Sequence, residues 1–322
     1  MRILVVGAGA IGGLLAGAFA NAGHEVGVVV RGAHLDAIRR DGLVVRWIDR
    51  DAGCYRVAAS DRPEDFGPQD AIVIALKGYS IAAMLPRLAG LLRPETAVVT
   101  AINGIPWWYF ARHGGRYDGM RIECLDPDGA MARALDPRYL IGGVVHTAAE
   151  VVAPGVVQHT SGRLHFLGEL DGRDTPRLAA ICAAIDAGGL AARSSAVIRN
   201  EVWMKLIGNL AYNPLATLTL ARMDEVNRNA DLLSLIHTLM TEGMAVAEAY
   251  GQPITISIEE RIELARKVGA AKVSMHQDLD KRRPLEIDAI SGAVVELARK
   301  AGVRIPITEA IHALISERAR HN

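Results

Sequence analysis

The N-terminal half of the chain alternates short apolar runs with segments of helical apolar spacing. Residues 2–6 (RILVV) form an apolar run without polar alternation, which is typical of a parallel strand buried on both faces. Further runs predict strands at 26–30, 43–47, 55–58, 71–76, 97–101 and 120–123, with helical segments such as 14–22 and 81–92 between some of them. Strands that alternate with helices predict an α/β fold with a doubly wound, mostly parallel sheet.

The pattern changes twice further along the chain. Short apolar runs at 144–147, 156–159 and 164–166, separated by Pro154-Gly155 and Ser161-Gly162, predict antiparallel strands or hairpins. From residue 196 onward the apolar spacing is helical, in segments at 199–220, 230–250, 258–268 and 285–301. We therefore predict two domains, a sheet domain over residues 1–195 and an all-helical domain over residues 196–322. The cleft between two such domains is where a ligand site is expected.

The composition of the chain argues against several classes of function. The 322 residues contain 36 Lys and Arg against 36 Asp and Glu, and this balance argues against a nucleic-acid or membrane-surface partner. The three cysteines lie far apart, and the ten histidines show no metal-ligand spacing, so neither disulfides nor a metal site are expected. No apolar run approaches the roughly 18 residues that a membrane span requires. These features predict a cytoplasmic protein.

A glycine-rich hexapeptide follows the first predicted strand and opens the first predicted helix. It matches G-x-G-x-x-G and consists of Gly7, Ala8, Gly9, Ala10, Ile11 and Gly12. In this context the three glycines provide a tight turn, a close backbone approach to a pyrophosphate, and close helix–strand packing. The unpaired N–H groups of the helix N-terminus favour phosphate. The motif predicts a dinucleotide-binding domain of the Rossmann type; a glycine-rich turn without a ligand is the alternative.

Three polar residues follow predicted strands of this domain. Arg31 comes directly after the second strand, where a site for NAD usually has a carboxylate, and its guanidinium suits the 2′-phosphate of NADP. Lys77 and Asn103 follow two other strands, whose carboxyl ends line the ligand crevice of an open α/β sheet. A solvated arginine and ordinary turn chemistry are the alternatives.

A polar stripe crosses the first helix of the predicted second domain. Lys205, Asn209 and Asn213 are spaced i, i+4 and i+8 among apolar residues, so they share one helix face. Partial burial of this face would lower the pKa of the lysine. The face suits a ligand site, and a narrow solvent-exposed stripe is the alternative. Glu286 lies in the first turn of a later predicted helix, where simple helix capping would also explain it.

Taken together, these motifs resemble the ketopantoate reductase (2-dehydropantoate 2-reductase) family over nearly the whole chain. The resemblance is carried by GAGAIG at 7–12, Arg31, Lys77, NG at 103–104, WMKLIGNLAYNP at 203–214 and SMHQDLDKRRPLEID at 274–288. It implies a Rossmann domain, a helical second domain like that of 6-phosphogluconate dehydrogenase, and NADPH-dependent reduction of a 2-oxo acid. The most specific expectation is 2-dehydropantoate to pantoate, as in pantothenate biosynthesis.

The resemblance also implies roles for individual residues. Lys205 matches the proton donor of the family, and Glu286 matches its essential carboxylate. The substrate-contacting positions match Asn103, Asn209, Asn213 and Ser274. The cofactor-contacting positions match the glycine-rich hexapeptide, Arg31, Lys77, Asn103 and, in the segment GGVVHTAA, Thr147.

Two departures from the family leave the substrate open. Met223 stands where the family often has an asparagine, and the NG loop continues into the aromatic run 107–110 (WWYF). The aromatics are either core residues or a pocket lining for a bulkier oxo acid. A related NADP-dependent dehydrogenase acting on another oxo or hydroxy acid, and a non-catalytic nucleotide-binding sensor, are therefore the alternative functions. The sequence does not determine the oligomeric state, for which a homodimer is one candidate, or the direction of the reaction in the cell.

Overall fold

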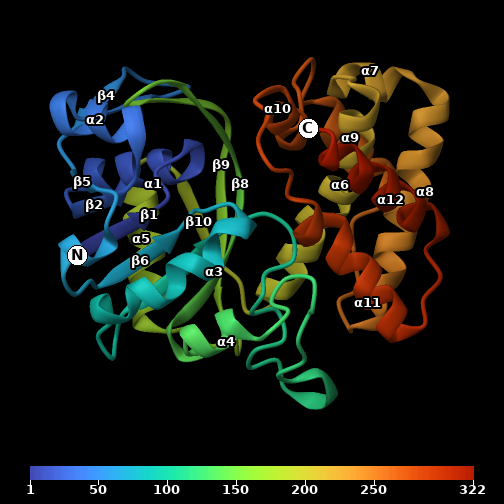
Figure 1. Cartoon of the computed structure of the whole chain (residues 1–322), viewed down its shortest axis with the longest axis horizontal. Coiled ribbons are helices and arrows are strands. Elements are labelled where there is room, and N and C mark those ends of the chain that lie inside the picture. The colour runs from blue at the N-terminus through green and yellow to red at the C-terminus, as the bar shows by residue number, and fades with distance from the viewer. The chain divides into compact units, whose positions relative to one another are not determined.

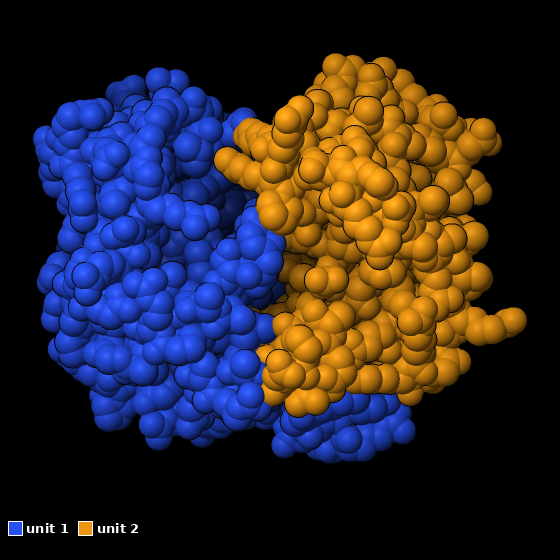
Figure 2. Space-filling view, in the orientation of Figure 1, with its two compact units in different colours: residues 1–102, 110–120, 129–198 blue, residues 103–109, 121–128, 199–322 orange.

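The computed structural model describes all residues, Met1–Asn322, and the chain divides into two compact units (Figure 2). Unit 1 comprises residues 1–102, 110–120 and 129–198, and unit 2 comprises 103–109, 121–128 and 199–322. The division differs in detail from a single boundary after residue 195. Two loop segments of the N-terminal half, 103–109 and 121–128, belong with the helices of unit 2.

Unit 1 is built on one ten-stranded sheet (Figure 1). Its strands are β1 (Arg2–Val6), β2 (Glu25–Val29), β3 (Leu43–Arg46), β4 (Gly53–Tyr55), β5 (Ala58–Ser60), β6 (Ala71–Ile74), β7 (Ala97–Ala101), β8 (Leu140–Ala153), β9 (Val156–Glu169) and β10 (Ala191–Ser194). The order is β4-β3-β9-β8-β7-β6-β1-β2-β5, with β10 paired to β9. Only β8–β9 and β3–β4 pair antiparallel. The predicted fold class, with its mostly parallel sheet, is confirmed.

Helices cover both faces of the central strands. The helices of unit 1 are α1 (Ala10–Asn21), α2 (Gly32–Asp41), α3 (Ile81–Met84), α4 (Ala130–Ala134) and α5 (Pro176–Ala187). Ile3 and Val5 of β1 share a core with α1 and α5. Leu4 and Val6 point to the opposite face and are also fully buried. Burial on both faces explains why these strands show no polar alternation in the sequence.

Three local predictions from the sequence need correction. Residues 120–123 form no strand, and the N–H groups of Glu123 and Cys124 donate to the Glu296 carboxylate at 2.7 and 2.8 Å. Ser161-Gly162 does not separate two strands; it lies inside β9 at a register shift, so β8 and β9 form one long hairpin. The helix predicted at 81–92 is α3 followed by a 3₁₀ segment, Leu85–Leu91, with a proline at its start.

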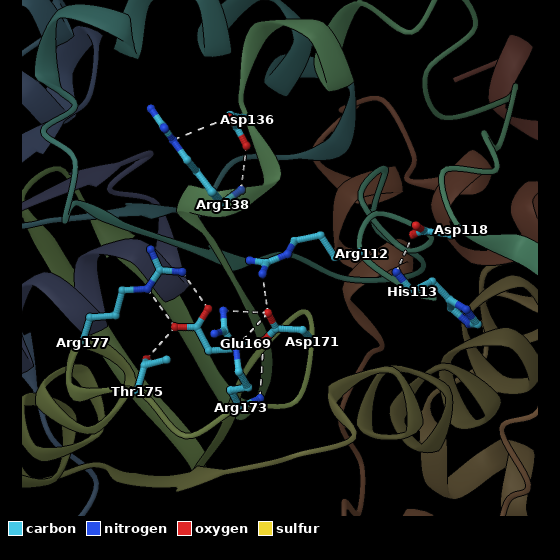
Figure 3. Close-up of polar contacts among 10 residues, drawn as sticks. All are labelled: Arg112, His113, Asp118, Asp136, Arg138, Glu169, Asp171, Arg173, Thr175 and Arg177. Carbon is cyan, nitrogen blue, oxygen red and sulfur yellow. Dashed lines mark hydrogen bonds and ion pairs between the residues drawn. The ribbon is translucent and has the colours of Figure 1, made fainter. Parts of the chain in front are cut away.

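Paired charges hold the segment after β9 in place (Figure 3). Glu169 is 2% exposed and accepts hydrogen bonds from Arg177 Nε and Nη2 at 2.7 and 2.6 Å, and from Thr175 Oγ1 at 2.6 Å. Asp171 accepts from Arg112 and Arg173. Because each carboxylate has a cationic partner within unit 1, we assign this cluster a structural role.

Unit 2 is helical, as predicted. Its helices are α6 (Ile198–Thr219), α7 (Met223–Arg228), α8 (Ala230–Ala249), α9 (Ile258–Arg266), α10 (Ser274–Asp280), α11 (Ala293–Ala301) and α12 (Pro306–Arg320). A π-helical turn, Asp288–Gly292, precedes α11. The sequence pattern did not predict α7, α10 and α12. No helix is both long and apolar enough to cross a membrane.

Candidate active site

The glycine-rich turn between β1 and α1 has the geometry that its sequence predicts. Gly7 has φ +96°, and a Cβ there would lie 2.8 Å from the Ala75 carbonyl oxygen. A Cβ on Gly12 would lie 2.0 Å from the Gly7 carbonyl oxygen, whereas a Cβ on Gly9 would meet no atom within 4 Å. No side chain caps the N-terminus of α1. An open approach at Gly9 and uncapped N–H groups fit the pyrophosphate of a dinucleotide.

The polar stripe predicted in unit 2 lies on α6. Lys205 and Asn209 are half-buried, and Asn213 is 5% exposed. The side chains of Asn209 and Asn213 make no hydrogen bond within the protein, which leaves both carboxamides available to a ligand. A stripe facing solvent would be more exposed than this, so burial favours the interpretation as a ligand-binding face.

Lys205 and Asn103 are joined directly. The Lys205 ammonium donates a hydrogen bond to Asn103 Oδ1 at 2.6 Å, although 102 residues separate the two in sequence. Burial lowers the pKa of Lys205 to about 8, the nearby Glu286 carboxylate opposes this effect, and the Arg261 guanidinium adds to it. A lysine with this pKa is largely protonated at neutral pH and can release its proton readily.

The segment 103–109 is fixed to the other elements of unit 2 at both ends. Ile105 N–H donates to the Ala289 carbonyl of the π-helical turn at 2.7 Å. Further along, Arg199 Nε donates to the Tyr109 carbonyl at 2.6 Å and Trp203 Nε1 donates to the Tyr109 hydroxyl at 2.7 Å. These hydrogen bonds hold Asn103 against Lys205, since Arg199 and Trp203 belong to the same helix as Lys205.

Models of one protein family match both halves of the chain. The model described as Ketopantoate reductase PanE/ApbA matches residues 3–172, and the model of its C-terminal domain matches residues 197–319. The chain belongs to the ketopantoate reductase family. The predicted family, and with it the prediction of an oxidoreductase, are therefore confirmed.

Individual members of the ketopantoate reductase family are similar over the full length. A 2-dehydropantoate 2-reductase of Mesorhizobium japonicum is 41% identical, covering 98% of this chain and 97% of the relative. A protein of Ralstonia solanacearum MolK2 that is assigned as a ketopantoate reductase has a crystal structure with TM-score 0.93 and 36% identity, covering 99% and 98%. The 2-dehydropantoate 2-reductase of Geobacter metallireducens GS-15 gives TM-score 0.87 and 26% identity, covering 99% and 100%.

The remaining residues that family resemblance singled out are spread over both units. In unit 1, Arg31 is exposed at the N-terminus of α2, Lys77 follows β6, and Thr147 is buried in β8 with no hydrogen-bond partner for its hydroxyl. In unit 2, Ser274 is exposed as the first residue of α10, and Glu286 is half-buried near Lys205. Their roles in ligand binding stay predictions.

The two departures from the family pattern belong to buried regions. Met223 is 6% exposed, and its carbonyl accepts from Asn227 Nδ2 at 2.8 Å. Asn227 Oδ1 in turn accepts from the Tyr212 hydroxyl at 2.7 Å, and burial raises the pKa of that hydroxyl to about 12. The aromatic run 107–110 is buried, with Trp107 8% and Trp108 2% exposed. Burial favours a core role for the aromatics over a pocket lining.

Sequence reasoning missed a histidine that supports the glycine-rich turn. His34 of α2 hydrogen-bonds through Nε2 to the Ala8 carbonyl at 2.9 Å, and its Nδ1 accepts from Gly155 N–H at 2.7 Å. Since Nδ1 accepts, Nε2 carries the proton, and the neutral ring bridges the turn to the β8–β9 hairpin. Burial lowers the pKa of His34, which favours the neutral ring.

His34→Ala should lower the free energy of unfolding by about 1–3 kcal/mol at pH 7.5, because two partners lose their hydrogen bonds. The wild-type advantage should be complete above pH 6.5 and shrink as the pH falls below it, because protonated Nδ1 cannot accept from Gly155. Unfolding at pH 7.5 and 5.5 checks this, with the exposed His321→Ala as control. An equal difference between wild type and His34→Ala at both pH values would contradict it.

Proposed function

We propose that the chain reduces 2-dehydropantoate to pantoate with NADPH. The proposal is supported by the 41% identity to a 2-dehydropantoate 2-reductase and, above all, by the Lys205–Asn103 hydrogen bond of 2.6 Å on a face that also carries two unpaired carboxamides. A cationic proton donor beside amide groups suits a substrate whose keto oxygen becomes an alkoxide.

Each side chain of the site then has a defined task. When bound, NADPH would supply a hydride for the keto carbon. Lys205 polarises the keto oxygen and gives it a proton as the negative charge develops. Asn103 orients the ammonium by accepting a hydrogen bond from it, and Glu286 stabilises the charged form of Lys205. Asn209, Asn213 and Ser274 bind the polar groups of the substrate.

The cofactor belongs to the glycine-rich turn of unit 1. The N–H groups at the start of α1 would hold the pyrophosphate, and Lys77, which follows β6, and Thr147 of β8 would contact the cofactor. Arg31 makes no hydrogen bond or ion pair within the protein and stands exposed after β2. Its guanidinium is therefore available to bind the 2′-phosphate of NADPH.

Arg31→Ala should raise the KM for NADPH about 10- to 100-fold and change the KM for NADH by less than about threefold. The reason is the loss of one charge-assisted contact to phosphate, worth roughly 1.5–3 kcal/mol. Initial rates with both cofactors at saturating 2-dehydropantoate measure this, and Arg39→Ala, which removes an arginine from the helix that Arg31 precedes, is the control. Equal use of NADH and NADPH by the unaltered protein would contradict the cofactor assignment.

A panel of 2-oxo acids tests the substrate. We expect NADPH oxidation to be fastest, by kcat/KM, with 2-dehydropantoate. A higher kcat/KM with another 2-oxo acid would favour the related dehydrogenase, and D-mandelate dehydrogenase shares this fold at TM-score 0.84 and 22% identity. Binding of NADPH without turnover of any compound would favour a nucleotide sensor.

We further propose that the protein acts in the cytoplasm as a homodimer. Cys54, Cys124 and Cys182 are free thiols, and free thiols persist in a reducing compartment. A ketopantoate reductase of Staphylococcus aureus with the same fold is described as dimeric. Light scattering at micromolar concentration tests the dimer, and a monomer mass would contradict it.

A further inference from the structure

Helix α9 contributes an arginine to the face of α6 that carries Lys205. A Cβ on Gly208 would lie 2.5 Å from Arg261 Nη2 and 3.0 Å from its Nε, so the guanidinium packs on the backbone of Gly208. Gly208 comes three residues after Lys205 and directly before Asn209. Gly208, on which the Arg261 guanidinium packs, lies less than one helical turn from Lys205, about 4.5 Å along the helix axis.

Nothing within the protein neutralises this guanidinium. Arg261 is half-buried, its Nε is buried without a hydrogen-bond partner, and it forms no ion pair. Arg266, on the same helix, is exposed and paired with Glu263. An unpaired charge is costly to bury, and burial accordingly lowers the pKa of Arg261. An anion from outside the protein would remove that cost.

The surroundings of Arg261 suit one kind of anion. Lys205 and Arg261 place two positive charges close together, and the charge of Arg261 lowers the pKa of Lys205. Tyr212, one turn beyond Gly208, is the other ionisable group that interacts with Arg261. In a 2-oxo acid the carboxylate is bonded directly to the keto carbon. A proton donor for the keto oxygen and a binding group for the carboxylate must therefore lie side by side.

We propose that Arg261 binds the carboxylate of the 2-oxo acid substrate and thereby turns the adjacent keto oxygen toward Lys205. This inference rests on the proposed function and extends it to substrate selection. A guanidinium pairs with a carboxylate through two parallel hydrogen bonds, which fixes orientation as well as position. The absence of a side chain at Gly208 makes room for the guanidinium at that place.

Arg261→Gln and Arg261→Lys test this role, with Arg266→Gln as the matched control on the same helix. The substrates are 2-dehydropantoate and the pair 3,3-dimethyl-2-oxobutanoate and its methyl ester, at saturating NADPH. For Arg261→Gln we expect the KM for both acids to rise about 10- to 100-fold, with little change in the KM for NADPH. The preference for acid over ester should shrink by a similar factor. Arg261→Lys should be intermediate, because it keeps the charge and loses the second hydrogen bond.

A purely structural arginine would behave differently. Its loss would lower the melting temperature and would weaken acid and ester alike. Removal of Arg261 should also raise the pKa of Lys205, and so move the alkaline limb of the kcat/KM profile to higher pH. An unchanged acid-to-ester ratio in active Arg261→Gln or Arg261→Lys protein would overturn the inference and leave the proposed function intact. Failure of the unaltered protein to reduce any 2-oxo acid would instead overturn the proposed function, and this inference with it.

Discussion

Lys205→Ala should lower kcat roughly 10²–10⁴-fold, the range for loss of a positioned proton donor. The variant should stay folded and keep most of its affinity for NADPH, since the glycine-rich turn belongs to unit 1 and Lys205 to unit 2. In this variant Asn103 Oδ1 loses its hydrogen-bond donor. The developing alkoxide loses both its proton donor and the positive charge of the ammonium. Measurements of kcat, NADPH affinity and melting temperature on one preparation separate these effects.

Lys267→Ala is the matched control for this prediction. Lys267 is exposed directly after α9 in the same unit, so its removal changes the net charge equally without touching the stripe on α6. Its kcat should stay within about twofold of wild type, as for most surface substitutions. A near-normal kcat in folded Lys205→Ala protein would show that another group delivers the proton.

Gly104→Ala should destabilise the protein by about 2–5 kcal/mol and lower kcat at least tenfold. Gly104 has φ +77°, and a Cβ there would lie 2.2 Å from the Ala289 carbonyl oxygen, which is backbone and cannot swing away. The collision pushes the loop off the π-helical turn, breaks the Ile105 to Ala289 hydrogen bond, and shifts Asn103 away from Lys205. Thermal unfolding and steady-state kinetics measure the two effects.

Gly251→Ala separates backbone strain from collision. Gly251 has φ +73° in the same unit, but a Cβ there would meet nothing within 4 Å. This variant should therefore lose only about 1–2 kcal/mol and keep its kcat. Equal losses of stability and kcat in the two variants would contradict the view that the contact with Ala289 positions Asn103.

The sheet of unit 1 was predictable because a strand buried on both faces has an apolar run without polar positions in its sequence. Ile3 to Val6 are all fully buried, so the strand has no polar position, and β6 and β7 show similar apolar runs. The error at 120–123 arose because a partner from far along the chain replaces strand pairing there. The Glu296 carboxylate accepts hydrogen bonds from the backbone N–H groups of Glu123 and of the next residue, Cys124, and no local pattern indicates this contact.

The stripe on α6 was predictable for a similar reason, since helical periodicity places Lys205, Asn209 and Asn213 on one face whatever surrounds them. The hydrogen bond from Lys205 to Asn103 was not predictable from residue spacing, because it depends on how the loop that carries Asn103 packs against α6. Arg261 gave no signal either. It lies in the charged segment IEERIELARK, where an arginine that packs on Gly208 has the same local pattern as one in solvent.

The pH dependence of kcat/KM for 2-dehydropantoate, compared between wild type and Lys205→Ala, tests the central claim most directly. Lys205 must be protonated to donate, so wild-type kcat/KM should fall as the pH rises through about 8, the pKa to which burial lowers this lysine. In Lys205→Ala the residual kcat/KM should be low and should not fall as the pH rises through this range. The same limb near pH 8 in both proteins would contradict the assignment of Lys205 as the proton donor.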